Sequence, residues 1–243
     1  MQLKGKTALI TGGGTGIGAA AALALAAQGC RVAISGRRED KLRELASSFQ
    51  GEPAIVYRVA DVADRQSAFD LVDWAQRELG QIDIIVQSAG VNVVKRKLAE
   101  LDPADWDKLM AVNATGAFNV MHAALPQMRQ RRDGLIINIS SIAGKRASML
   151  GGVAYSAAKF AMTALSTCAS LEFGEEGIRV TNIYPGEVDT PILENRPVPV
   201  TPEHRARILK PEDVAAAIVM IAKLPPRAHV AEMVIKPTSQ PYA

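Results

Sequence analysis

Cysteine is scarce in this chain of 243 residues, and its acidic and basic side chains are nearly balanced in number. The two cysteines, Cys30 and Cys168, have no spacing typical of metal ligands and suggest no disulfide framework. We therefore predict no metal site and a reducing, cytoplasmic location. A formal net charge of +3 gives no indication of binding to nucleic acid or to an anionic membrane.

Long apolar runs are also lacking. One Ala/Leu-rich run, from Ile17 to Ala27, follows Lys4 and Lys6 in the manner of a signal peptide. However, it is much shorter than the roughly 20 residues that cross a bilayer. Glycines between residues 12 and 18 interrupt the region where the apolar core of such a peptide would lie. The sequence predicts neither export nor a membrane span.

Short apolar runs rich in β-branched residues alternate with longer Ala/Leu-rich segments along the whole chain. The predicted strands are Thr7–Ile10, Arg31–Ser35, Ile55–Val59, Ile82–Val86, Leu135–Ile139, Arg179–Tyr184 and Met233–Ile235. The predicted helices are Ile17–Gln28, Glu39–Phe49, Arg65–Glu78, Ala104–Met128, Ala154–Phe173 and Pro211–Ile221. Because the strands are nearly continuous apolar runs, they fit a parallel sheet that is buried on both faces.

The fold class that follows is α/β, with a doubly wound, mainly parallel sheet of about seven strands and helices on both faces. The length alone would also permit two small domains. No linker rich in Gly, Ser or Pro divides the chain, and no repeat is present, so residues 1–243 are expected to form one domain.

The segment Pro185–Lys210 contains five prolines, which disfavour a regular helix through it. A long irregular segment in a compact α/β domain is usually a lid or a binding loop. We expect a substrate loop at about 186–210, and a plain surface connection is the alternative.

A glycine-rich turn follows the first predicted strand, with the sequence Thr11-Gly12-Gly13-Gly14-Thr15-Gly16-Ile17-Gly18. Glycine lets the phosphates of a ligand approach the backbone, and the start of the following helix offers free N–H groups and partial positive charge. At the carboxyl end of a strand in an open α/β sheet, this pattern predicts a dinucleotide site. The expected contacts are Gly12, Gly14, Thr15, Gly16, Ile17 and Gly18.

The end of the second strand indicates which dinucleotide is bound. Sites for NAD usually place Asp or Glu here, whereas this chain has Gly36 followed by Arg37 and Arg38. A charge-assisted contact to the 2′-phosphate of NADP contributes about 1.5–3 kcal/mol. We therefore predict NADP, with NAD as the alternative. Asp61 and Val62, after the third strand, are expected to lie beside the adenine.

Tyr155 and Lys159 are four residues apart at the start of a predicted helix, so their side chains share one face. A free tyrosine has a pKa of about 10, too high for efficient proton exchange near neutrality. A lysine ammonium at about 4 Å would supply the roughly 4 kcal/mol that lowers this pKa by three units. An ordinary amphipathic helix is the alternative reading of the pair.

Taken together, several motifs resemble the short-chain dehydrogenase/reductase family, and they occur in family order over nearly the whole chain. They are the glycine-rich turn, Ala89-Gly90, Asn113, Ser140-Ser141, Tyr155-x-x-x-Lys159 and Pro185-Gly186. The resemblance implies a Rossmann-type fold and an enzyme that interconverts a carbonyl and an alcohol with a nicotinamide cofactor.

The resemblance also implies a role for each catalytic residue. Tyr155 would be the general acid in reduction and the base in oxidation, and Lys159 would lower its pKa and hold the nicotinamide ribose. Ser141 would hydrogen-bond the substrate oxygen, and Asn113 would order a water that relays protons to Lys159. The further cofactor contacts implied are Ala89, Gly90, Pro185, Gly186, Val188 and Thr190.

One departure from the family pattern lies after the fourth strand. Gln87-Ser88-Ala89-Gly90 stands where the family usually has Asn-Asn-Ala-Gly. Those asparagines mainly steady neighbouring strands in the family, so the departure concerns local packing more than catalysis.

The substrate is expected to contact Val91–Val94, Ala143–Gly151 and Glu187–Leu193. The cations of Lys95-Arg96-Lys97 and Lys145-Arg146 either favour an anionic substrate or form a solvated face. The tail Val234–Ala243 is similar to that of family members acting on serine and other 3-hydroxy acids. A 3-hydroxy or 3-oxo acid is therefore the leading substrate class, with 3-oxoacyl thioesters and xenobiotic ketones as alternatives.

The expected partners are a small-molecule carbonyl or alcohol and further copies of the chain. In similar proteins the helix corresponding to Ala154–Phe173 joins subunits, which predicts a homotetramer or a homodimer. Two other functions remain open: a catalytically idle dinucleotide sensor, and a methyltransferase with a similar glycine turn. The latter needs a carboxylate at the end of the second strand, where Gly36 is found.

Overall fold

The computed structural model describes residues 2–241, so the last two residues of the predicted tail, Tyr242 and Ala243, lie outside the described part. Within it, seven parallel strands form one sheet in the order β3-β2-β1-β4-β5-β6-β7. The predicted doubly wound α/β fold is confirmed. The strands are β1 (Thr7–Thr11), β2 (Arg31–Gly36), β3 (Val56–Val59), β4 (Ile84–Gln87), β5 (Gly134–Ile139), β6 (Ile178–Pro185) and β7 (Glu232–Ile235).

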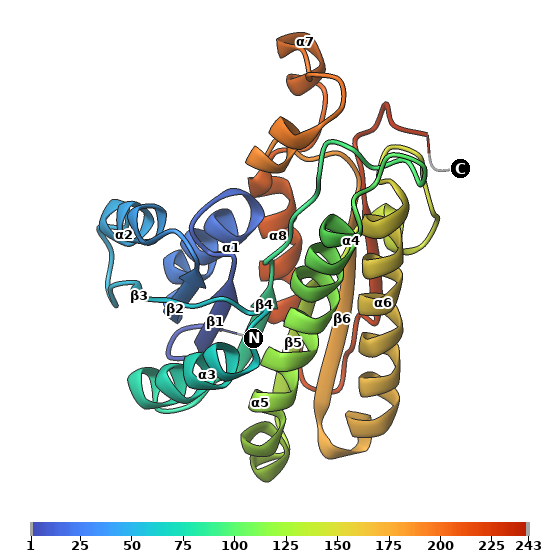
Figure 1. Cartoon of the computed structure of the whole chain (residues 1–243). Helices are drawn as coiled ribbons and strands as arrows, with labels where there is room; N and C mark the ends of the chain where they lie inside the picture. The colour runs from blue at the N-terminus through green and yellow to red at the C-terminus, as the bar shows by residue number, and fades with distance from the viewer. Residues whose placement is uncertain (1, 242–243) are drawn as a thin grey trace.

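Helices cover both faces of the sheet (Figure 1). They are α1 (Gly16–Ala27), α2 (Glu39–Ser48), α3 (Arg65–Leu79), α4 (Pro103–Met110), α5 (Gly116–Arg131), α6 (Val153–Phe173), α7 (Pro202–Arg205) and α8 (Pro211–Ala222). Short helical turns are η1 (Ala111–Thr115), η2 (Ile142–Gly144), η3 (Gly174–Glu176) and η4 (Pro191–Asn195). Among the described residues, none of these helices is both long and apolar enough to pass through a membrane.

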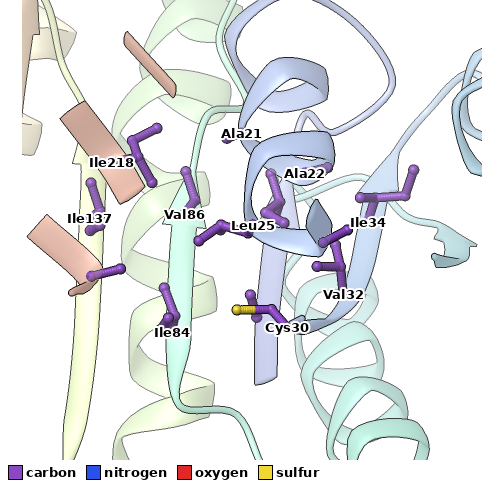
Figure 2. Packing of buried hydrophobic residues seen from close by; sticks show 14 of the residues in the cluster. Ala21, Ala22, Leu25, Cys30, Val32, Ile34, Ile84, Val86, Ile137 and Ile218 are labelled. Atoms are coloured by element: carbon purple, nitrogen blue, oxygen red, sulfur yellow. The ribbon is translucent and has the colours of Figure 1, made fainter. Parts of the chain in front are cut away.

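Two apolar cores form because alternate side chains of each buried strand point to opposite faces of the sheet. Helices α1, α2 and α8 pack on one face, against residues such as Ile10 and Val86. Helices α3, α5 and α6 pack on the other, against residues such as Leu9 and Ile85. Figure 2 shows Leu25 of α1 among side chains of β2, β4 and α8 in the first core.

The prediction that the strands are buried on both faces holds for the centre of the sheet. Every residue of β1, β4 and β5 is buried. The edge strands β3 and β7 have no neighbour on one side, and none of their residues is buried. Each of them also contains a charged residue, Arg58 in β3 and Glu232 in β7, which fits this position.

The single helix predicted over Ala104–Met128 is wrong in detail. The segment runs from Pro103 to Arg131 and is interrupted by the π-helical turn η1. A π turn holds one extra residue, and such turns are frequent at functional sites. Apolar periodicity does not reveal it, because helical spacing resumes directly after the turn.

The proline-rich segment is irregular, as predicted, with the short turns η4 and α7 as its only helices within the described residues. Ion pairs fold it back onto the end of β6. Asp189 pairs with Arg205 and Lys210, and Glu187 pairs with Arg196 and His204.

Leu25 tests the first core, because its side chain is fully buried. We expect Leu25→Ala to lower the free energy of unfolding by about 2–5 kcal/mol, since it leaves a cavity in a well-packed site. Urea unfolding followed by circular dichroism measures this. Leu98→Ala, at a position 75% exposed, is the control and should change stability by less than about 0.5 kcal/mol. Equal effects of the two variants would contradict this description of the core.

Candidate active site

A cleft of about 790 Å³ lies at the carboxyl ends of the strands. It spans the boundary between β1 and β4, where the strand order reverses direction and where ligands bind in open α/β sheets. Every residue predicted to bind the cofactor or to act in catalysis lines this cleft, except Gly18 and Asn113. The fold thus gathers residues from seven separate segments of the sequence.

The glycine turn lies tightly against the turn after β4. A side chain at Gly12 would place its Cβ 2.7 Å from the backbone nitrogen of Ala89, and Gly12 has a φ of +65°. A Cβ at Gly18 would overlap the carbonyl oxygen of Gly12. The hydroxyl of Thr15, the N-cap of α1, makes no capping hydrogen bond to this helix. The turn thus has space and helix N–H groups for a phosphate.

Basic side chains lie beside this turn at the end of β2. Arg38 donates a hydrogen bond from Nη2 to Oγ1 of Thr15 at 3.1 Å. Arg37 lies 3.9 Å from the carboxylate of Asp61, and both side chains are about half exposed. A Cβ at Gly36 would meet only Leu42, at 3.7 Å, so this end of the cleft is open. The residues present fit a phosphorylated ribose, because two guanidinium groups flank the open space.

Asp61 and Val62 form the side of the cleft next to the basic residues. The Asp61 carboxylate accepts a hydrogen bond from the Ala63 N–H at 3.0 Å, and the Val62 carbonyl accepts one from Asn119 at 3.0 Å. These bonds fix the turn after β3, which leaves the Val62 side chain as an apolar wall.

Tyr155 and Lys159 lie one turn apart near the start of α6, and Lys159 is buried. The Lys159 ammonium donates a hydrogen bond to the Ile139 carbonyl at 2.8 Å and lies 5.7 Å from the centre of the Tyr155 ring. Burial lowers the pKa of Lys159 to about 8.

We predicted that Lys159 lowers the pKa of Tyr155, and for the chain without bound ligands this prediction is wrong. Burial raises the pKa of the Tyr155 phenol above its usual value, against smaller opposing effects of a hydrogen bond with Ser141 and the charge of Arg96. Lys159 is not among the groups that shift it. Its ammonium is instead directed to the backbone carbonyl of Ile139.

Two adjacent serines follow β5, and the structure separates their surroundings. Ser141 caps η2 by accepting a hydrogen bond from the Ala143 N–H at 3.1 Å, and it also bonds with Tyr155. The Ser140 hydroxyl is buried and lies 3.4 Å from the Lys159 carbonyl. Ser141 is therefore the hydroxyl beside the phenol, at the position indicated by the family pattern.

Asn113 lies in the π turn η1 and is completely buried. Its side-chain amide bonds with both the N–H and the carbonyl of Val91 and with the carbonyl of Leu109, each at 3.0 Å. A Cβ at Gly90 would lie 3.0 Å from the Asn113 Oδ1 and 3.6 Å from the Lys159 Nζ. The Asn113 amide is thus near Lys159, but its hydrogen bonds hold the loop after β4.

The segment after β6 closes the cleft from the other side. The Gly186 N–H donates to the Ile235 carbonyl at 2.7 Å, and Val188 pairs with Leu209. The Glu187 N–H donates to the side-chain carbonyl of Gln240 at 3.0 Å. The tail therefore steadies the Pro185-Gly186 turn, a contact that no sequence motif indicates.

Of the basic residues expected beside the substrate, the arginines line the cleft and two of the lysines form ion pairs outside it. Lys145 pairs with Glu232 and lies over the Tyr184 ring, and Lys97 pairs with Glu100. Neither lysine lines the cleft. Arg96 and Arg146 do line it. Lys97 and Lys145 thus fit the solvated-face alternative, whereas the two arginines lie where a substrate is expected.

The departure at Gln87 lies in a polar row across the sheet, in register with Thr11 and Asn138. The Gln87 side chain is buried and its Nε2 has no hydrogen-bond partner within the described residues. The Oδ1 atoms of Asn138 and Asn182 are likewise without one. At the departure itself, the structure therefore has a buried amide nitrogen without a hydrogen-bond partner among the described residues.

Comparisons with known proteins agree with this geometry. The family model described as short chain dehydrogenase matches residues 6–198. An uncharacterized oxidoreductase of Staphylococcus saprophyticus is 34% identical over 239 residues, which cover 98% of this chain and 99% of the relative.

Two solved structures share the fold over nearly their whole length. The closed form of a serine dehydrogenase complexed with NADP⁺ has a TM-score of 0.89 at 28% identity, covering 98% of this chain and 97% of that one. An alcohol dehydrogenase from the archaeon Thermococcus sibiricus, complexed with 5-hydroxy-NADP, has a TM-score of 0.88 at 27% identity, covering 98% and 99%. With a family match over most of its length, this chain belongs to the short-chain dehydrogenase family of oxidoreductases.

Proposed function

We propose that this protein is an NADP-dependent oxidoreductase that interconverts a carbonyl and a secondary alcohol. One observation carries the proposal: the Tyr155 phenol, hydrogen-bonded to Ser141 and followed by a buried Lys159, lines the same cleft as the glycine turn. A proton donor and a dinucleotide site in one cleft are what hydride transfer to a carbonyl requires.

In this proposal each catalytic side chain acts at a stated atom. Tyr155 donates its phenolic proton to the substrate oxygen in reduction and accepts it in oxidation. Ser141 donates a hydrogen bond to the same oxygen and orients it toward the phenol. Lys159 would bind the ribose hydroxyls of the nucleotide, and Asn113, which holds the loop after β4, would order a water that relays protons to Lys159. NADPH supplies the hydride when it is bound.

The cofactor assignment rests on the basic end of the cleft. Arg37 and Arg38 would hold the 2′-phosphate, and Asp61 and Val62 would flank the adenine. The glycine turn would hold the pyrophosphate, and Ala89, Gly90, Pro185, Gly186, Val188 and Thr190 would complete the site. NADP or its analogue in the two similar structures supports this choice.

The proposed substrate is a 3-hydroxy or 3-oxo acid. Likeness to a serine dehydrogenase and the cleft-lining Arg96 and Arg146 support this class. Alcohol dehydrogenase is an equally similar fold, so a general ketone or a 3-oxoacyl thioester is the second candidate. If no substrate is turned over, the alternative function is that of a catalytically idle dinucleotide sensor.

The protein is further proposed to work in the cytoplasm as a homotetramer or homodimer. The α6 face away from the sheet exposes Phe160 and Leu171, at 43% and 81%, and α5 exposes Phe118 at 39%. Large exposed side chains on neighbouring helices fit a contact between subunits.

Tyr155→Phe tests the proton donor. Because general acid–base groups contribute about 10²–10⁴-fold, we expect kcat to fall by that factor while NADPH still binds. Absorbance of the reduced nicotinamide reports turnover, and quenching of protein fluorescence reports binding. Tyr57→Phe, on edge strand β3 outside the cleft, is the matched control. Unchanged turnover in Tyr155→Phe would refute the assigned role.

The double substitution Arg37→Gln with Arg38→Gln tests cofactor choice. Losing charge-assisted contacts of about 1.5–3 kcal/mol should weaken NADPH binding by roughly 10- to 150-fold. Binding of NADH should change by less than about threefold, as for an ordinary surface substitution. Fluorescence titration gives both constants, and Arg43→Gln on the exposed side of α2 is the control. Equal losses for the two nucleotides would show that the arginines do not select the phosphate.

A further inference from the structure

Arg96 is a buried arginine in the loop between β4 and α4, with only 7% of its surface exposed. Its guanidinium donates hydrogen bonds to three backbone carbonyls, those of Val93 at 2.9 Å, Leu150 at 2.6 Å and Asn195. These carbonyls belong to three different loops around the cleft: the loop after β4, the loop before α6 and the end of η4. Arg96 therefore joins the walls of the region where substrate is expected.

No carboxylate of residues 2–241 forms an ion pair with Arg96. Burial and the neighbouring charge of Arg196 lower the pKa of the guanidinium. Arg196 has a partner of its own, because it pairs with Glu187 at 2.8 Å. A buried cation is costly unless an anion compensates it, and here the compensating anion is missing from the chain.

Arg96 also lies in the same cleft as the proposed catalytic side chains. It lines the same cleft as Ser141 and Tyr155, and its charge acts to lower the pKa of the Tyr155 phenol. A guanidinium has five N–H donors in a planar fork. Three of them are used by the backbone carbonyls, which leaves one N–H on each terminal nitrogen for a ligand.

We propose that Arg96 binds the carboxylate of a 3-oxo or 3-hydroxy acid whose reacting oxygen lies at Ser141 and Tyr155. The inference rests on the proposed function and assigns its substrate selectivity to one residue. In a 3-oxo acid one methylene separates the carboxylate from the carbonyl, so the anion and the reacting carbon lie in neighbouring parts of the cleft. Arg96 also holds the three loops, and the test separates these two roles.

The probes are acetoacetate and its neutral analogue methyl acetoacetate, each reduced with NADPH. Replacing Arg96 with Gln should lower the ratio of kcat/KM for the acid to kcat/KM for the ester by roughly 10- to 150-fold, since a charge-assisted contact is lost. Arg96→Lys should retain part of the ratio, because it keeps the charge. Arg131→Gln is the matched control: this arginine also donates to backbone carbonyls, those of Ile82 and Gln127, but lies outside the cleft. Its ratio should match that of the wild type.

Three outcomes would overturn the inference. If Arg96→Gln loses activity on acid and ester equally, Arg96 is only a brace between loops. If the wild type reduces the ester better than the acid, there is no carboxylate site. The same holds if it reduces neither probe but does reduce other ketones, and in both cases the proposed oxidoreductase activity stands. If no carbonyl compound is reduced, the proposed function itself fails.

A measurement on the wild type covers the case in which Arg96→Gln does not fold. Acetate should inhibit reduction of methyl acetoacetate competitively, whereas acetamide, of similar shape and no charge, should inhibit at least about tenfold more weakly, which corresponds to about 1.4 kcal/mol. Equal inhibition by the two compounds would count against Arg96 as a carboxylate site.

Discussion

The close approach of two backbone turns, after β1 and after β4, is the constraint on which the rest of the cleft depends. Gly12 and Ala89 come so near that no side chain fits between them, and α1 begins directly over Gly12 because Gly18 also lacks a side chain. The loop that continues from Ala89 carries Arg96, and Asn113 fixes it at Val91. The nucleotide turn and the loop after β4 therefore share one rigid boundary.

Burial disfavours the charged forms of the ionisable side chains in this part of the cleft. The pKa of Tyr155 is raised and the pKa of Lys159 is lowered, so both shifts favour the neutral forms. The pKa of Arg96 is also lowered, but an arginine remains protonated because its usual pKa is very high. The low dielectric strengthens each remaining interaction with a ligand. The proposed cofactor and substrate would bring anionic groups to a region where the chain itself supplies mostly cations and hydroxyls.

Much of this arrangement was predictable from sequence, because it depends on local pattern. The central strands read as apolar runs, the glycine turn marks its own position, and Tyr155 and Lys159 share a face by helical spacing. What depends on long-range partners was not predictable. The carboxylate partner of Lys145 and the Leu150 and Asn195 carbonyls held by Arg96 come from distant parts of the sequence. The π turn at Asn113 was missed for a different reason, because apolar spacing does not reveal it. Helical spacing also gave no indication that the Lys159 ammonium donates to the Ile139 carbonyl.

The hydrogen bond between Glu187 and Gln240 gives the end of the chain a part in shaping the cleft. A few residues after the last strand, the tail turns back over the Pro185-Gly186 turn, and Gln240 and Pro241 line the cavity wall. Loss of the Gln240 side chain would therefore free the Glu187 N–H and loosen that wall, although Gln240 belongs to none of the motifs of the cleft.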